Sequence, residues 1–291
     1  MDFLTVFAVL PTVSDYSTRL NVLFFYMSWA TLKMAHTAMW LELSGTVLVR
    51  VFFYFLPSII FFVFDVAAPG IAASFKKQGE AGLPTGSKSS WPTSREAKIA
   101  GWAVANFVLG LSAQWMVEGV LSKTTRGPAV KATLSVPLPW TMTGQLFWGF
   151  LIREILSYAI HRWGLHYKDS IFPWLVECHK SWYHDLTNTF PLTAHYDHPF
   201  IYLLSTWLPM YLPVCILGFH TVTFLLYTLL ISLEEVFVFC GYCKLPSFLL
   251  SMAARHAESH LADGKAYFGR WGYIDLLLGT LGNGEKAKKR K

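Results

Sequence analysis

The feature that most constrains this chain is residues 200–239, forty almost uncharged residues with Pro209 and Pro213 near the first third. A helix needs about twenty mostly apolar residues to cross the hydrocarbon core of a bilayer. The run is therefore long enough for two helices placed back to back as a hairpin. Such a hairpin returns the chain to the face of the membrane from which it started, so we expect the segments on either side of it on the same face.

Composition supports a membrane protein. Hydrophobic residues make up 54% of the 291 residues and charged residues only 14%, whereas about 25% is usual for a soluble domain. The net charge is +6, and much of the excess lies in polar segments, notably "FKK" at 75–77 and "EKAKKRK" at the C-terminus. Basic residues beside hydrophobic spans are typical of a cytosolic membrane face. No basic patch on a soluble domain is visible, so we expect no nucleic-acid partner.

Three further spans are expected in the N-terminal part, near 20–42, 44–72 and 99–121. The loop at 73–98 is polar and rich in Gly, Ser, Pro and Lys, and a fourth apolar stretch at 142–160 runs directly into a histidine motif. The sequence thus predicts an all-α polytopic integral membrane protein with about four to six membrane-embedded helices and a cytosolic histidine-rich cap. We expect an N-terminal membrane region at 1–140 and a second domain at 141–291 that contains the histidine motifs and the basic tail.

Eight of the ten histidines fall in three clusters, which are His161 and His166; His179, His184, His195 and His198; and His256 and His260. Residues i and i+4 of a helix lie about 40° apart, so the imidazoles of His256 and His260 can reach one metal. Residues i and i+5 lie about 140° apart. The pairs His161/His166 and His179/His184 therefore need a helix end, a bend or two different metals.

The histidine clusters indicate metal binding more than a chance distribution of interfacial histidines does. Neutral imidazole suits iron, zinc, copper and nickel. A structural zinc site is closed by four ligands and usually includes cysteine, so eight histidines exceed one zinc and indicate two metals. The only CxxC pair, Cys240 and Cys243, has no second pair to complete a zinc site. We interpret both cysteines as small apolar residues at a helix end. His36 and His220 stand alone in apolar stretches, where we expect hydrogen-bonded core histidines.

Three quoted segments resemble the fatty acid hydroxylase superfamily, specifically its sterol desaturase and sterol C4-methyl oxidase branch: "SYAIHRWGLH", "ECHKSWYHDLTNTFPLTAHYDHPF" and "RHAESHLADGKAYFGRWGYIDLLLGT". The resemblance covers roughly residues 140–280. It implies an endoplasmic-reticulum membrane protein with a di-iron centre, held by histidines beneath a cytosolic cap. It further implies O2 activation with electrons from a cytochrome b5 or reductase partner. The C-terminal "KKRK" matches a dilysine retrieval signal, which agrees with that location and requires a cytosolic tail.

The chain departs from the family pattern at three imidazoles. In the second motif, Trp182 and Tyr183 stand where two adjacent histidines are expected, and His184 follows one residue late. Ser259 replaces the middle histidine of the third motif, and Phe239 replaces the histidine of an "HSGY" element. The loss can open coordination positions, empty one metal site or abolish metal binding. Carboxylates inside or near the motifs are alternative ligands or salt-bridge partners, namely Asp185, Asp197, Glu234, Glu235 and Glu258.

The leading hypothesis from the sequence is a membrane-bound non-haem di-iron oxygenase that hydroxylates or desaturates a lipid, sterol or terpenoid-like substrate with O2. The resemblance assigns the metal-binding and catalytic roles to His161, His166, His179, His184, His195, His198, His256 and His260. A first alternative is a non-oxidative isomerase or cyclase that uses the same histidine-rich pocket for acid–base chemistry. A second alternative is a non-catalytic, lipid-binding member of the family.

Overall fold

The computed structural model describes residues 16–85, 92–124, 127–167, 170, 172–242 and 248–282. Helices dominate throughout, and these residues form no β-strand, only two isolated bridges. The prediction of an all-α protein is therefore confirmed. Cys243 and the basic C-terminal tail with its dilysine motif lie outside the described residues.

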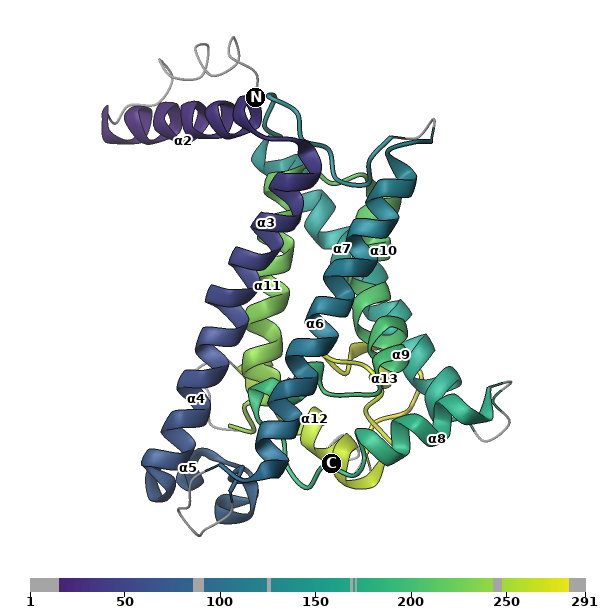
Figure 1. Ribbon diagram of the computed structural model, residues 1–291. Coiled ribbons are helices and arrows are strands. Elements are labelled where there is room, and N and C mark those ends of the chain that lie inside the picture. The colour runs from purple at the N-terminus through teal and green to yellow at the C-terminus, as the bar shows by residue number, and fades with distance from the viewer. Residues whose placement is uncertain are drawn as a thin grey trace.

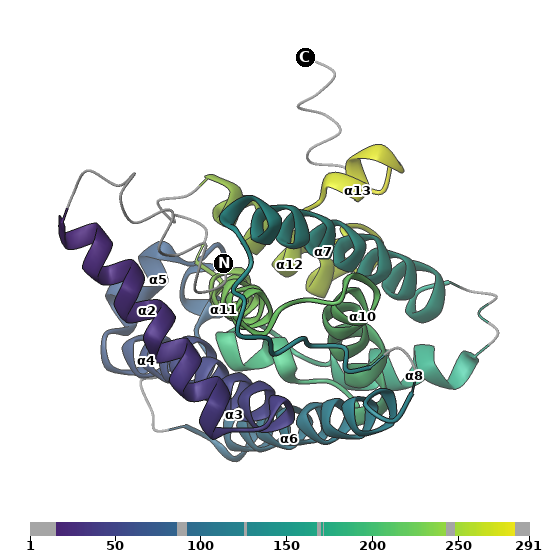
Figure 2. The same ribbon diagram turned by 90° about the horizontal axis from the view of Figure 1, so that it is seen from above.

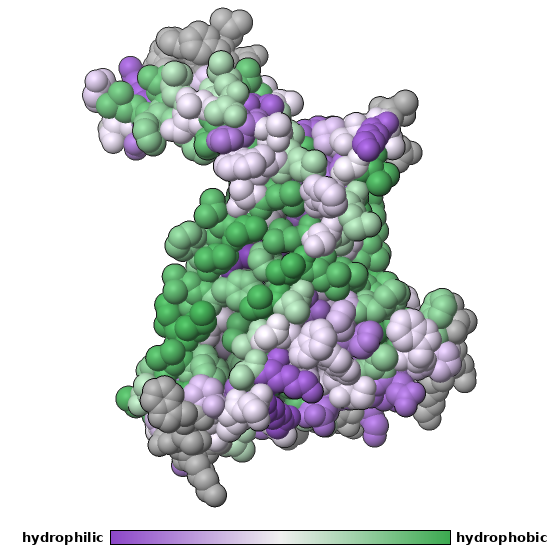
Figure 3. Space-filling view, in the orientation of Figure 1, coloured by the Kyte–Doolittle hydropathy of each residue, from purple (hydrophilic) through white to green (hydrophobic). Residues whose placement is uncertain are grey.

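Long helices run side by side and form a bundle (Figures 1 and 2). The helices long and apolar enough to cross a membrane are Ala38–Ala67 (α3 Ala38–Arg50, η2 Val51–Phe55, α4 Leu56–Ala67), Ser94–Leu121 (α6), Pro199–Leu217 (α9 Pro199–Tyr202, η6 Leu203–Trp207, α10 Leu208–Leu217) and Thr221–Phe239 (α11). The helix α7 (Pro139–Ala159) runs beside them (Figure 1). A hydrophobic band covers the middle of the bundle, between two more polar ends (Figure 3). These features confirm a polytopic membrane protein.

The bundle has polar groups inside and apolar groups outside, as lipid requires. Leu48, Ile60 and Val104 are exposed on the spans. Glu42 is buried instead, and its Oε1 accepts hydrogen bonds from Gln114 Nε2 at 2.7 Å and from the Tyr211 hydroxyl at 2.8 Å. Because lipid offers no hydrogen bonds, these polar side chains are stable only where they bond to one another.

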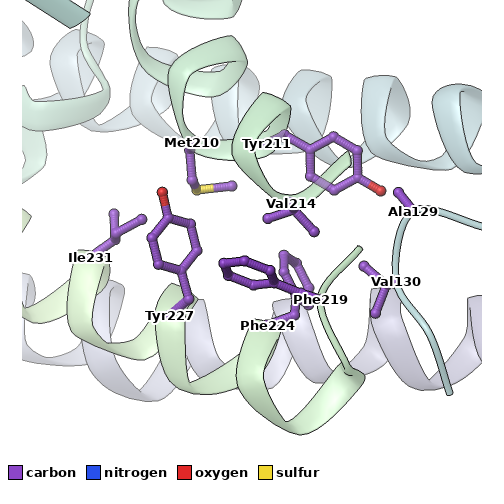
Figure 4. Close-up of a cluster of buried hydrophobic side chains, with 9 residues drawn as sticks. All are labelled: Ala129, Val130, Met210, Tyr211, Val214, Phe219, Phe224, Tyr227 and Ile231. Atoms are coloured by element: carbon purple, nitrogen blue, oxygen red, sulfur yellow. The ribbon is translucent and has the colours of Figure 1, made fainter. Parts of the chain in front are cut away.

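The apolar run 200–239 forms the predicted hairpin. The first arm ends at Leu217, and Gly218 takes the left-handed conformation (φ 59°) that glycine adopts without strain. The second arm starts at Thr221, where the ring of His220 accepts a hydrogen bond from the Val222 backbone N–H. Between the arms lies a buried cluster drawn in Figure 4: Ala129, Val130, Met210, Tyr211, Val214, Phe219, Phe224, Tyr227 and Ile231. The expectation for His220 holds, because its second ring nitrogen lies 3.2 Å from the Thr133 carbonyl oxygen.

The N-terminal part differs from the expected span at 20–42. Helix α2 (Tyr16–Ala35) ends before His36, and α3 begins anew at Ala38. The physical reason is local, because the Thr37 side chain caps α3 by accepting a hydrogen bond from the Trp40 backbone N–H. Helix α2 lies across one end of the bundle, nearly at right angles to α3 (Figures 1 and 2). The span that follows therefore starts at 38, six residues earlier than expected.

The opposite end of the bundle holds short elements that form a cap (Figure 1). The elements are α5 (Pro69–Phe75), η3 (Gly79–Gly82), η4 (Ile160–Leu165), α8 (Pro173–Trp182), η5 (Pro191–His195), α12 (Phe248–Asp263) and α13 (Tyr273–Leu277). Both segments that flank the 199–239 hairpin lie at this end, as the hairpin predicts. The cap therefore gathers the histidine motifs from distant parts of the sequence.

Candidate metal centre

Five histidines from all three sequence motifs converge in the cap. They are His161, His166, His179, His184 and His260, and the ring centroids of neighbouring pairs lie 4.4–5.2 Å apart. Four of the five, all except His184, present ring nitrogens within 4.8 Å of one another. His184 joins the group through its Nε2, 3.2 Å from the Nε2 of His166. We call these residues the five-histidine group.

The first pair is brought together by a widened helical turn. After α7 the chain continues as a π-helix, Ile160–Leu165, in which hydrogen bonds join residues i and i+5. His161 lies inside this segment and His166 caps it, so two residues five apart lie on one face. Their ring centroids are 4.9 Å apart. The bend that the HX4H spacing requires is thus a π-turn.

A widened turn at the end of α8 also brings the second pair, His179 and His184, together. The His184 backbone N–H donates to the His179 carbonyl oxygen at 3.4 Å, an i→i+5 contact. The ring centroids of the two residues lie 5.0 Å apart. The late position of His184 in its motif is therefore compensated by a wider last turn, and the imidazole still reaches the group.

Each of three rings has an acceptor at Nδ1 and no partner at Nε2. The Nδ1 atoms lie 2.9 Å from the Phe268 carbonyl oxygen for His161, 2.7 Å from Asp197 Oδ2 for His179, and 2.7 Å from the Ala266 carbonyl oxygen for His260. The Nε2 atoms of all three are buried and have no hydrogen-bond partner. An acceptor at Nδ1 fixes the tautomer with a lone pair on Nε2, which is the arrangement that metal-ligating histidines use.

The environment favours the neutral form of three imidazoles of the group. Burial lowers the pKa of His161 and His260 well below the usual value, and the neighbouring imidazoles lower both further. Burial also lowers the pKa of His184 to about 4, with a further contribution from His179. Neutral imidazole is the form that binds a metal. The five-histidine group therefore fits at least one metal ion, because it offers buried nitrogens without partners and because His161, His184 and His260 are held in the neutral form.

Three of the eight predicted ligands lie outside the group. His195 is buried, stacks on Tyr54 with centroids 4.3 Å apart, and places its Nε2 3.1 Å from Glu235 Oε2. His198 caps α9, where its Nδ1 accepts from the Phe200 backbone N–H at 3.3 Å. The structure therefore gives both residues other partners.

His256 also faces away from the group, despite its favourable i, i+4 spacing to His260. Its ring stacks on Tyr267 with centroids 4.3 Å apart. The His256 ring also packs against Gly272, where a Cβ atom would lie 2.5 Å from it. Gly272 has φ 74°, so a side chain there would be strained as well as crowded. Helical spacing permits the pair to share a metal, but the contact with Tyr267 directs His256 elsewhere.

The carboxylates proposed as substitute ligands have other roles. Asp197 holds His179 and is the only one of them against the five-histidine group. Glu234 forms two hydrogen bonds with Arg153 at 2.8 and 3.0 Å, and Glu235 pairs with Arg50 as well as with His195. The side chain of Asp185 is exposed.

Glu258 is buried on the other side of α12. Its Oε1 faces Gly241. Burial raises the pKa of Glu258 to about 7, although the two nearby lysines, Lys77 and Lys76, act in the opposite direction. It is a cap carboxylate rather than a neighbour of the five-histidine group.

A cavity opens onto the five-histidine group and reaches the ends of two spans. Its volume is about 100 Å³, below the range of most small-molecule sites. His161, His179 and His260 line it, together with Thr206 of the first hairpin arm and Val238 of the second. The lining combines aromatic and aliphatic side chains with few charged groups beside the imidazoles, so it suits a largely apolar ligand.

The positions of the missing histidines show how the site has changed. Tyr183 and Phe239 both line the cavity. Trp182 packs against Trp102 with centroids 4.9 Å apart, and Ser259 accepts a hydrogen bond from Lys77 Nζ at 2.7 Å. Aromatic rings thus occupy the part of the cavity where further imidazoles would stand.

Several residues of the site carry no signal in a histidine pattern. The carbonyl groups of Ala266 and Phe268, which hold two of the rings, belong to a segment without regular structure. Asp275 positions this segment, since its carboxylate accepts from the backbone N–H groups of Phe268 and Gly269 at 2.8 and 2.7 Å. Arg270 also lines the cavity. The sequence signal for Asp275 is the "YIDLLLGT" segment, which contains it.

Residues 146–280 match the family model described as Fatty acid hydroxylase. The matched region contains all eight predicted histidines, the hairpin 199–239 and the segment that holds the imidazoles. No solved structure matches the chain.

Proposed function

The chain belongs to the fatty acid hydroxylase family through residues 146–280, and from this premise we propose that it is a metal-dependent membrane oxidoreductase that hydroxylates or desaturates a lipid with O2. One observation carries the proposal. The Nε2 atoms of His161, His179 and His260 are buried and unpaired in one small group, while each Nδ1 has an acceptor. Burying three such nitrogens without a partner is costly, and a metal ion would satisfy all three.

The five-histidine group would hold the metal, with His166 and His184 completing the set. A bound iron would supply O2 activation and the oxidation of a C–H bond. The ligands for a second iron are incomplete in the part of the chain that the structure describes, since His195 lines the cavity but pairs with Glu235, and His198 and His256 contact other groups. The site of this chain therefore supports one metal ion better than the di-iron centre that the sequence resemblance implies.

The other residues of the cavity would bind and orient the substrate. Val238 and Phe239 offer an apolar surface where the second hairpin arm ends, and Tyr267 closes the cavity from the cap. Asp197 would keep the Nδ1–H of His179 in place and so hold its Nε2 lone pair toward the metal. An apolar lining around the imidazoles also limits the access of water to the reacting atoms.

The location and the redox partner belong to the same proposal. Exposed lysines lie on the cap, namely Lys77, Lys98, Lys180 and Lys265, and the positive-inside tendency supports a cytosolic cap. A cytosolic cap would let a cytochrome b5 or reductase deliver electrons. The endoplasmic reticulum and the sterol desaturase and C4-methyl oxidase branch are supported by the sequence motifs and the basic tail.

The test is the metal content of the purified protein, combined with lipid turnover under air and under argon. We expect bound iron and a strict requirement for O2. Protein that contains no metal and still converts a lipid anaerobically would refute the proposal.

A second candidate function rests on a different observation. Tyr183 and Phe239 line the cavity in place of two imidazoles, and the His179–Asp197 pair stands beside them. This arrangement favours acid–base chemistry on a lipid-like intermediate, as in an isomerase or cyclase. The argon arm of the same experiment distinguishes the two functions, because only the non-oxidative reaction would continue without O2.

A further inference from the structure

We propose that Tyr267 is a positioning residue of the metal centre: its left-handed backbone turns the Ala266 carbonyl group onto His260, and His256 holds Tyr267 in this conformation. The proposal rests on the proposed function for the presence of a metal, but not for the arrangement of the rings. Among the residues that the structure describes, Tyr267 is the only one other than glycine with a positive φ, 60°. A bulky residue rarely adopts this conformation, and such strain persists only where the surroundings enforce it.

The strained residue stands between two carbonyl groups that hold imidazoles. The Ala266 carbonyl oxygen lies 2.7 Å from the Nδ1 of His260. The Phe268 carbonyl oxygen lies 2.9 Å from the Nδ1 of His161. One short segment therefore orients two rings of the five-histidine group, and the residue in its middle carries the strain.

The torsion φ of Tyr267 sets the direction of the Ala266 carbonyl group relative to the chain that follows. This following chain is fixed, because the Asp275 carboxylate accepts a hydrogen bond from the Phe268 backbone N–H at 2.8 Å. An ordinary φ near −60° would turn the Ala266 peptide by about 120° and direct its carbonyl group away from His260. The left-handed conformation is thus what allows the segment to hold the second ring as well as the first.

Three contacts hold Tyr267 in place. Its backbone N–H donates to the Thr280 carbonyl oxygen at 3.1 Å, and its side chain packs with Leu281 in a buried cluster. Its ring stacks on His256, with centroids 4.3 Å apart and planes inclined by 20°. His256 is buried and stands one turn before His260 on α12. The stack therefore ties Tyr267 to the helix that carries His260, which gives His256 a role in the metal centre without making it a ligand.

The experiment observes the rings in the metal-free protein. The full chain is produced with isotope-labelled histidine, treated with a chelator and studied by NMR in detergent above neutral pH, where imidazole is uncharged. Wild type should show a slowly exchanging Nδ1–H proton on both His161 and His260, assigned with the alanine variant of each. Tyr267→Val should lose the His260 signal and keep the His161 signal, because a β-branched residue disfavours a positive φ. Its metal affinity should fall by about 10–100-fold.

Tyr267→Asn is the matched variant, because asparagine tolerates a positive φ. It should keep the His260 signal and bind metal at least about tenfold more tightly than the valine variant. Gly79→Val is the control for strain elsewhere in the cap, since Gly79 has φ 57° and an added Cβ would meet nothing within 4 Å. It should lower the unfolding temperature and leave both signals and the metal affinity unchanged.

A second pair of variants tests His256. His256→Phe keeps an aromatic ring against Tyr267 but has no nitrogen, so it should retain the His260 signal and the metal. His256→Ala removes the stack and should weaken both. Equal loss of metal in the two variants would make His256 a ligand and overturn its part in the proposal.

Two results would overturn the role of Tyr267. The first is a valine variant that keeps the His260 signal and wild-type metal affinity. The second is an asparagine variant that loses both as the valine variant does, which would assign the effect to the ring rather than the backbone. If the valine variant fails to fold, Tyr267→Ala replaces it, since alanine also disfavours a positive φ. The proposed function fails separately, if wild type binds no iron and consumes no O2, because the NMR signals need neither.

Discussion

Two sets of histidines from the same motifs have different environments in this molecule. In the five-histidine group, His161, His179 and His260 are each held at Nδ1 by an acceptor and are open at Nε2. In the other set, His195 joins a buried pair with Glu235 and His198 caps a helix. The role of a histidine in this protein therefore depends more on the contact made by its second ring nitrogen than on its spacing to the next histidine in the sequence.

The largest effect is expected when an imidazole with an open Nε2 is removed. His161→Ala and His260→Ala should each lower metal affinity by more than about 100-fold, because even residues that only orient a ligand cost about 10–100-fold. Metal content by mass spectrometry of the purified variants is the measurement. His198→Ala is the matched control from the other set and should keep wild-type metal content. Equal metal loss in all three variants would show that the two sets do not differ.

The next largest effect concerns stability rather than metal. Glu235→Gln removes the charge shared by Arg50 and His195, all three of them buried. Leaving a buried arginine unpaired should lower the free energy of unfolding by about 3–5 kcal/mol. Denaturant unfolding in detergent measures it, and metal stoichiometry should stay unchanged in the folded fraction. A loss of metal without a loss of stability would place Glu235 in the metal centre and contradict the comparison.

A smaller effect is expected where the acceptor at Nδ1 changes. Asp197→Asn keeps the shape of the side chain but removes the carboxylate that faces His179 Nδ1 at 2.7 Å. Metal affinity should fall by about 10–100-fold, determined by competition with a chelator. Asp185→Asn changes an exposed aspartate in the same motif and serves as the control. If both variants bind metal as wild type does, orientation by Asp197 is not what distinguishes the five-histidine group.

The smallest effect is the response of the metal-free protein to pH. The pKa of His184 falls from 6.5 in the unfolded chain to about 4 in the folded protein, mainly through burial. Between these values the unfolded chain binds a proton that the folded protein does not, so stability decreases as pH falls from 6.5 toward 4. The unfolding temperature of chelator-treated protein should therefore decrease over this window.

His184→Gln is the matched variant for this pH response. It should show a smaller decrease, because glutamine does not titrate. His198→Gln, outside the five-histidine group, should behave as wild type. A decrease of the same size in all three proteins would assign the response to other groups.

The sequence alone predicts the membrane architecture well and the metal centre only in part. Uninterrupted apolar runs specify helices because lipid leaves the backbone no other partner, which is why the hairpin 199–239 is found where it is expected. The break at His36 was missed because a single capping threonine, Thr37, outweighs the apolar character on both sides of it. Hydropathy averaged over a window of residues does not detect one hydrogen bond at the start of a helix.

The metal centre is harder to predict because it depends on contacts between distant segments. Spacing along one helix favours His256 as a ligand, but its stacking on Tyr267 is a tertiary contact that no local pattern reveals. The spacing of His161 and His166 argues against a shared site on an ideal helix, and a π-turn makes it possible. Both differences come from the surroundings of a residue rather than from its position in a motif.

The widened turns have a consequence for how such a site changes over evolutionary time. A π-turn holds one residue more than an α-turn, so removing one residue from between His161 and His166 would convert HX4H into HX3H on a regular helix. Both forms place the two imidazoles on one face. Single-residue insertions and deletions, which usually misalign every side chain that follows, can thus be neutral here. His184 stands one residue later than the family pattern expects, which is the change that a single-residue insertion would produce.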